Sequence, residues 1–291
     1  MFVAGIDGGG THTRIEVRDM ENHVVRRGEF GPFNINSIGE EAFRSLIGEI
    51  FSWCGDMQRC VGLCVGGAGI SNPKVKRILE EELAGVEFCG KWRLCGDQEI
   101  ALRGAMDGPG VVIIAGTGSI CFGKNDTGEI ARSGGYGHLI DDGGSGYALG
   151  RDVIARAVRA LDGRILDKGI LQAVCDRLEG DPEKIVPFVY APETDKASIA
   201  KFSSIALEQA ELGNPEALEI LDRGAEELSQ MVSAVQRRLG LAQCRIALLG
   251  GLLETDNPYR RVVAEKLSNL GTVVPAANNA LWGAAQIAWE L

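Results

Sequence analysis

Three consecutive glycines near the N-terminus, Gly8-Gly9-Gly10, constrain the fold of this chain more than any other stretch of its sequence. They lie between an apolar run at residues 2–6 and a run at 13–18 in which Ile15 and Val17 alternate with charged residues. This alternation predicts a half-buried strand, so the glycines should form the tip of a β-hairpin. A plain glycine-rich turn would satisfy the same pattern.

Such a tip can also bind a phosphate group. Glycines let a backbone turn so tightly that its N–H groups converge on an anion, and Thr11 and Thr13 add hydroxyl groups nearby. The two common glycine-rich nucleotide motifs instead lead from a strand into a helix. A glycine tip between two strands therefore predicts a different class of phosphate-binding protein.

The composition limits what the chain can do. Its 291 residues are enough for two domains with separate cores, and a net charge of −10 argues against a nucleic-acid partner. No basic amphipathic segment indicates a membrane surface, and the N-terminal apolar run is too short for a signal peptide. We therefore expect a soluble, cytoplasmic protein that binds neither nucleic acid nor membrane.

Cysteine and histidine spacing does not favour a metal centre. The eight cysteines include no Cys-x-x-Cys pair, and several lie within apolar runs. We expect reduced, buried thiols that act as small hydrophobic groups. The three histidines also lack metal-ligand spacing.

The opening pattern occurs a second time. Residues 111–115 lead into Gly116-Thr117-Gly118-Ser119, and further extended runs follow at 120–124 and 129–133. Two such units predict duplicated α/β domains, with a linker at residues 107–110. Further strands are expected at 61–66, 91–95 and 245–249, and helices at 39–52, 73–83, 98–106, 146–160, 164–178, 197–211, 215–239 and 258–268.

One segment imitates a P-loop. Residues 118–125 nearly match the Walker A pattern, but Asn125 stands where Ser or Thr is required. The middle of the segment is strand-like, whereas a P-loop opens a helix. We interpret Gly116-Thr117-Gly118-Ser119 instead as a second phosphate-binding hairpin.

The motifs, in their order, resemble the BadF/BadG/BcrA/BcrD ATPase family and, within it, its N-acetylglucosamine kinases, which belong to the sugar kinase, heat-shock chaperone and actin superfamily. The segments that carry the resemblance are Asp7-Gly8-Gly9-Gly10-Thr11, Gly96-Asp97, Gly116-Thr117-Gly118-Ser119, residues 134–146, and Leu248-Leu249-Gly250-Gly251.

The resemblance implies two actin-like, ribonuclease H-like α/β domains with a nucleotide cleft between them. The domains would span residues 1–107 and 108–277, and a C-terminal helix at 278–291 would return to the first. The domains would close over ATP, Mg²⁺ and a sugar, which excludes water. A homodimer would be usual for the family.

The resemblance also assigns the nucleotide contacts. Asp7 would hold Mg²⁺ through water, although it could equally brace its turn. The residues implied for ATP are Gly8, Gly9, Gly10, Thr11, Thr13, Gly116, Thr117, Gly118, Gly250 and Gly251.

Asp97 matches the catalytic aspartate of the family. It lies between a strand and a helix, where a carboxylate could take the proton of the attacking hydroxyl group, or where it could simply cap the helix. The residues implied for the sugar are Asn34, Asp97, Ser119, Gly135, Tyr136 and Asp142. Asn36 could replace Asn34 in register, and either asparagine could be an ordinary loop residue.

The expected activity is ATP-dependent phosphorylation of an amino sugar, with N-acetylglucosamine and its 6-hydroxyl group as the first candidate acceptor. Tyr136 replaces a family tryptophan and Ile120 a family asparagine, so glucosamine and N-acetylmuramate stay open. An ATPase activator of a 2-hydroxyacyl-CoA dehydratase or benzoyl-CoA reductase is a further alternative. Activators carry cluster-binding cysteines after the second phosphate loop, and residues 134–147 contain none.

Overall fold

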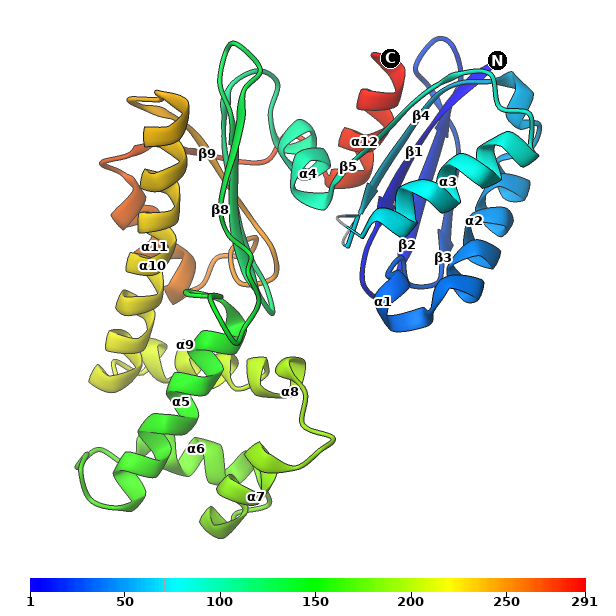
Figure 1. Cartoon of the computed structure of the whole chain (residues 1–291). Helices are drawn as coiled ribbons and strands as arrows, with labels where there is room; N and C mark the ends of the chain where they lie inside the picture. The colour runs from blue at the N-terminus through cyan, green and yellow to red at the C-terminus, as the bar shows by residue number, and fades with distance from the viewer. Residues whose placement is uncertain (68, 71) are drawn as a thin grey trace. The chain divides into compact units, whose positions relative to one another are not determined.

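The computed structural model describes residues 1–67, 69–70 and 72–291, which form two compact units. The first unit combines Met1–Asp107 with Ala276–Leu291, and the second is Gly108–Pro275. The chain passes from one to the other at the predicted linker, and the C-terminal segment belongs to the first unit (Figure 1).

The first unit is built on a five-stranded sheet in the order β3-β2-β1-β4-β5. The hairpin strands β1 and β2 are antiparallel, whereas β1, β4 and β5 are parallel, so the carboxyl ends of these three strands lie at one edge. The strands are β1 (Phe2–Gly8), β2 (Thr13–Arg18), β3 (Val24–Phe30), β4 (Cys60–Gly67) and β5 (Lys91–Gly96).

Helices cover both faces of this sheet. Alternate residues of β1 and β4 divide between two cores, one shared with α2 and α3 and the other with α4 and α12. Glycines bring α12 close: the backbone of Ala285 lies against Gly5, and Gly283 lies against the backbone of α4. The helices are α1 (Ile35–Ile38), α2 (Glu40–Cys54), η1 (Met57–Arg59), α3 (Pro73–Gly85), α4 (Asp97–Ala105) and α12 (Ala280–Trp289).

The prediction that β2 is half-buried was wrong. Its polar residues Glu16 and Arg18 are only 1% and 3% exposed, because that face is covered as well. Arg18 pairs with Glu16 and stacks on Trp282 of α12, so this buried charge is compensated.

The second unit repeats the strand order of the first. Its sheet runs β8-β7-β6-β9-β10, again with one antiparallel meander and two added parallel strands. The predicted duplication is therefore confirmed. The strands are β6 (Gly110–Ala115), β7 (Ser119–Lys124), β8 (Ile130–Gly134), β9 (Cys244–Leu249) and β10 (Gly271–Val274).

The helices of this unit differ in part from expectation. The helix expected at 197–211 is interrupted near Phe202, and the one expected from 164 begins at Gly169. The helices are α5 (Gly146–Leu161), α6 (Gly169–Arg177), η2 (Pro182–Lys184), α7 (Ile185–Tyr190), α8 (Lys196–Ala200), α9 (Ser203–Glu211), α10 (Pro215–Leu239) and α11 (Pro258–Leu267). The Walker-like segment is strand β7, which confirms its rejection as a P-loop.

The cysteines mostly follow the prediction. Six are buried, but Cys89 is exposed and Cys244 is partly exposed. Burial raises the pKa of Cys54 and of Cys60 to about 12, which keeps these thiols protonated. Within the described residues, no helix is both long and apolar enough to cross a bilayer.

Candidate functional site

The glycine hairpin forms the predicted turn. Gly9 N–H donates to the carbonyl oxygen of His12 at 2.9 Å, which closes the tip, so this amide is not available to a ligand. Gly10 and Thr11 are exposed at the tip, and their N–H groups make no backbone hydrogen bond within the described chain. Gly10 and Thr11 therefore offer free donors for a phosphate group.

Thr13 does not lie where the sequence placed it. Its side chain is fully buried, and its hydroxyl group donates to the carbonyl oxygen of Gly31 at 2.6 Å. Thr13 therefore braces the base of the hairpin and cannot reach a phosphate group in this arrangement. Strand alternation explains the difference, because Thr13 is the first residue of β2 and points inward.

Asp7 is a buried carboxylate with one cationic partner. The hairpin register places Arg14 opposite it, and the Arg14 guanidinium donates to Asp7 Oδ2 at 2.6 Å. Burial raises the pKa of Asp7, while the charge and hydrogen bond of Arg14 lower it, and burial has the larger effect.

Asp97 lies at the same edge of the sheet. The register aligns Gly8 of β1 with Gly67 of β4 and Gly96 of β5, so the residue after Gly96 follows a carboxyl end close to Asp7. Asp97 is the first residue of α4, and the cap position belongs to Gly96. Asp97 is therefore the first helical residue and not the cap residue, although its carboxylate bonds an amide of the first turn.

The environment of Asp97 suits a base. Its Oδ1 accepts from the Gln98 N–H at 3.0 Å, and the residue stays open to solvent. Nearby protein atoms displace water from the Asp97 carboxylate, and this desolvation raises its pKa above the ordinary value. The negative charge of Asp7 raises the pKa further. A carboxylate with a raised pKa accepts a proton more readily.

Both candidate asparagines lie in the loop before α2. Asn34 caps the short helix α1, and its Oδ1 accepts from the Asn36 N–H at 3.1 Å. Asn36 is exposed, and its Oδ1 accepts from the Asn72 side chain at 2.9 Å.

In the second unit, the predicted phosphate turn at residues 116–119 is hydrogen-bonded to the first residues of α5. Gly146 N–H donates to the carbonyl oxygen of Gly116 at 2.7 Å, and Tyr147 N–H donates to that of Thr117 at 3.2 Å. The Thr117 side chain is exposed, and a Cβ at Gly116 would meet no atom within 4 Å. Gly116 and Thr117 thus present an open surface.

Ser119 and Asp142 are both buried and lie against each other. The Ser119 hydroxyl group donates to the Gly143 carbonyl oxygen at 2.7 Å, and Asp142 Oδ1 faces the Ser119 N–H at 3.4 Å. A Cβ at Gly118 would lie 3.1 Å from Asp142 Oδ2. Ser119 was predicted to bind the sugar. Its hydroxyl proton is used by the Gly143 carbonyl oxygen, which fixes the turn, and its oxygen can still accept a hydrogen bond.

The glycine-rich segment after β8 presents an aromatic ring. Gly134 and Gly135 have φ angles of +76° and +74°, a conformation that favours glycine. Tyr136 follows directly and is 55% exposed, and the Arg132 guanidinium lies 4.9 Å from the centre of its ring. Tyr136 is therefore available to a ligand.

A polar cavity of about 250 Å³ lies beside Asp142. Arg151, Arg223 and Glu227 contribute to its lining. Burial raises the pKa of Asp142, an effect opposed by the Ser119 N–H.

Gly250 and Gly251 follow β9 but differ in their surroundings. Gly250 has a φ of +88°, and a Cβ there would lie 2.5 Å from the Ala115 carbonyl oxygen. A Cβ at Gly251 would meet no atom within 4 Å. Gly250 is required by the turn, whereas Gly251 leaves open surface.

The sequence interpretation missed three residues of the first unit. Arg14 pairs with Asp7, Asn72 contacts Asn36, and the Phe33 ring fills the space above Gly8. Only Arg14 could have been found, because a tip that pairs Gly8 with Thr13 places Arg14 opposite Asp7.

Comparison with known proteins defines the class. The model of the BadF/BadG/BcrA/BcrD ATPase family matches residues 4–288, and this chain belongs to that family.

Individual relatives cover almost the whole chain. An N-acetylmuramic acid/N-acetylglucosamine kinase of Clostridium acetobutylicum is 32% identical over 301 residues, covering 99% of this chain and 98% of that protein. An N-acetyl-D-glucosamine kinase of Dictyostelium discoideum is 31% identical and covers 90% of this chain and 89% of that protein. A crystal structure of a Chromobacterium violaceum protein, provisionally named an N-acetylglucosamine kinase, has a TM-score of 0.78 at 23% identity, with 98% of each chain covered. This last likeness supports the actin-like fold of the two units.

Proposed function

We propose that this chain is an ATP-dependent kinase that phosphorylates an amino sugar, with the 6-hydroxyl group of N-acetylglucosamine as the first candidate acceptor. The observation that carries the proposal is Asp97, a solvent-accessible carboxylate with a raised pKa at the carboxyl edge of the first sheet. The names of the Clostridium and Dictyostelium relatives support an amino-sugar substrate.

Different residues would bind the phosphates, accept the proton and orient the sugar during phosphoryl transfer. The N–H groups of Gly10 and Thr11, with the turn at Gly116 and Thr117, would hold the phosphates of ATP, and Gly251 would leave room for the nucleoside. Asp97 would take the proton of the sugar hydroxyl group as its oxygen attacks the γ-phosphorus and ADP leaves. Asn34, Gly135, Tyr136 and Asp142 would orient the sugar.

The donor set suits Mg²⁺. Asp7 offers a carboxylate oxygen, the type of ligand that this ion prefers, and such ions are held by one or two carboxylates together with substrate phosphates and water. Bound Mg²⁺ would neutralise charge on the phosphate oxygens. We include in this proposal a cytoplasmic location and a homodimer.

The test is a measurement of ADP release. Purified protein with ATP and Mg²⁺ is compared in the presence of N-acetylglucosamine, glucosamine, N-acetylmuramate, glucose and no sugar. We expect release that depends on an amino sugar, and the preferred acceptor identifies the substrate. Hydrolysis that no sugar stimulates would overturn the proposal and favour the activator class.

A further inference from the structure

The loop that carries Asn34 is fixed to the glycine hairpin at its start. Phe33 N–H donates to the Gly9 carbonyl oxygen at 2.9 Å. The Phe33 ring lies where a Cβ at Gly8 or Gly67 would be, at 2.5 and 2.9 Å. The start of the loop at residues 33–39 is therefore joined to the hairpin by one main-chain hydrogen bond and by the packing of the Phe33 ring.

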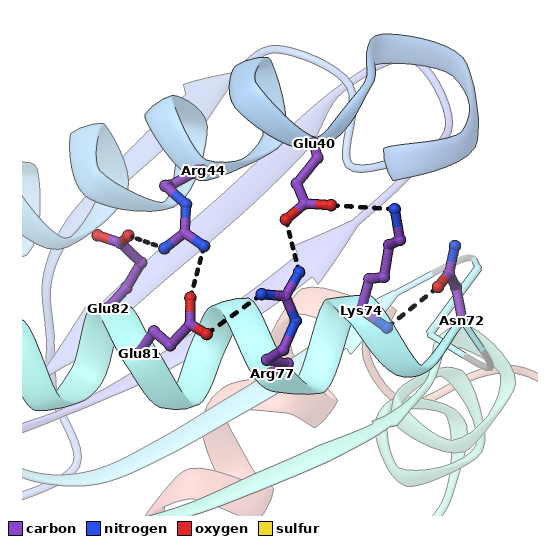
Figure 2. A network of polar contacts seen from close by, with 7 residues as sticks. All are labelled: Glu40, Arg44, Asn72, Lys74, Arg77, Glu81 and Glu82. Carbon is purple, nitrogen blue, oxygen red and sulfur yellow. Dashed lines mark hydrogen bonds and ion pairs between the residues drawn. The ribbon is translucent and has the colours of Figure 1, made fainter.

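The far end of the loop is fixed by ion pairs to α3. Glu40 is the first residue of α2, and its carboxylate lies 3.1 Å from Lys74 Nζ and 2.5 Å from Arg77 (Figure 2). One turn further along α2, Arg44 pairs with Glu81 and Glu82. These pairs are exposed or, for Arg44 and Glu82, partly buried, so each contributes little alone, but together they fix α2 relative to α3.

A side-chain hydrogen bond from Asn72 fixes the middle of the loop. Asn72 caps α3 through its Oδ1, which accepts from the Lys74 N–H at 3.1 Å, and its Nδ2 donates to Asn36 Oδ1 at 2.9 Å. The cap is visible in Figure 2. Asn72 therefore holds both the helix start and the loop.

We propose that Asn72 is a positioning residue for sugar binding, which acts through Asn36 on Asn34. The inference rests on the proposed function. Asn34 Oδ1 accepts from the Asn36 N–H, and among the described residues nothing bonds the Asn34 NH₂ group, which leaves it for a sugar oxygen. The Asn36 Oδ1 accepts from the Asn72 side chain. Asn34 is then the sugar contact, and Asn36 is the tether that fixes its turn.

Two substitutions remove the hydrogen bond between Asn72 and Asn36 and leave the other contacts of the loop in place. Asn72→Ser keeps a good helix cap but is too short to reach Asn36, and Asn36→Ala removes the acceptor. We expect each to raise the KM for the sugar about three- to tenfold, because one hydrogen bond is lost, with the KM for ATP unchanged. The double variant should show no further increase, because both changes remove the same bond.

Two controls separate positioning from general loosening. Asn36→Asp keeps an acceptor for Asn72 and should retain a sugar KM near that of the wild type. Arg44→Gln removes both ion pairs of Arg44 with α3 without touching the tether, and it should leave the sugar KM unchanged.

Hydrogen exchange gives a readout that does not depend on turnover. Amides of residues 34–39 should exchange faster in Asn72→Ser than in the wild type. Unchanged exchange, or an unchanged sugar KM in Asn72→Ser while the wild type is active, would overturn this inference alone. Absence of sugar-dependent ADP release in the wild type would overturn the proposed function, and the inference with it.

Discussion

Arg14 and Asp7 face each other across the glycine hairpin, with 2.6 Å between the guanidinium nitrogen and the carboxylate oxygen. Asp7 is the buried member of this pair, with 10% of its side chain exposed, whereas 51% of the Arg14 side chain is exposed. Arg14 thus supplies from the surface the positive charge that the buried carboxylate needs. It occupies an oxygen of the group that we propose for Mg²⁺.

Replacing Arg14 with Met should destabilise the protein at neutral pH. The buried Asp7 carboxylate loses its partner, and we expect the free energy of unfolding to fall by about 1–3 kcal/mol. Arg14 lowers the pKa of Asp7, so its removal should raise that pKa further above the unfolded value. The loss of stability should therefore be complete above the pKa that Asp7 has in the variant and should disappear below the pKa that it has in the wild type, which urea titrations across pH would measure.

Arg14→Lys is the control for this change, since it keeps a positive charge. It should recover much of the lost stability at neutral pH. Equal stability of the Met and Lys variants at every pH would contradict the electrostatic interpretation of the pair.

Asp97→Asn should separate activity from stability. Loss of a general base costs on the order of 10²-fold or more, so sugar-dependent ADP release should nearly vanish. Because the folded-state pKa of Asp97 is raised, its ionised form opposes folding at pH values above the unfolded pKa. The variant should therefore be at least as stable as the wild type at pH 7. Retained full activity would exclude Asp97 as the base.

The charge of Asp7 should be visible in the titration of Asp97. Asp7 raises the pKa of Asp97, so Asp7→Asn should lower it. Carboxyl carbon NMR of both proteins would measure the shift directly. In the wild type, the acid limb of the kcat/KM profile should lie above the ordinary carboxyl pKa of about 3.9, because Asp97 must be deprotonated to act.

Local patterns were sufficient to predict most of the fold. The extent of α10, with Asn214 and Pro215 at its start and Gly240 at its end, follows from the sequence because caps and periodicity agree there. The edge strand β10 was missed because four residues carry too little periodicity to separate strand from loop. Burial of Glu16 was missed because it depends on α12, more than 260 residues away, and no local pattern records that contact.

The candidate site was predictable at the level of residue types but not of hydrogen bonds. Thr11 and Thr13 look equivalent in the sequence, yet the first is exposed and the second is bonded to Gly31. The contact of Asn72 with Asn36 joins residues from separate elements, so only the folded chain reveals it.

Gly250 and Gly251 offer a matched pair for testing the turn after β9. Gly250→Ala must adopt a positive φ and approach the Ala115 carbonyl oxygen, so it should lower the free energy of unfolding by more than about 1 kcal/mol. Gly251→Ala meets no atom and should fold normally, and bulkier residues there should raise the KM for ATP. Equal stability of the two alanine variants, measured by urea unfolding, would contradict the geometry of this turn.

The buried ion pair beneath α12 predicts an asymmetric response to charge removal. Glu16 accepts from Arg18, which is buried, and from Arg27, which is exposed. Glu16→Gln leaves the Arg18 charge uncompensated and should destabilise the protein by about 3–5 kcal/mol. Arg27→Gln leaves the Arg18–Glu16 pair intact and should cost less than about 1 kcal/mol. Thermal and urea unfolding of the two variants would measure the difference, and similar losses would show that Arg27, and not Arg18, is the partner that stabilises Glu16.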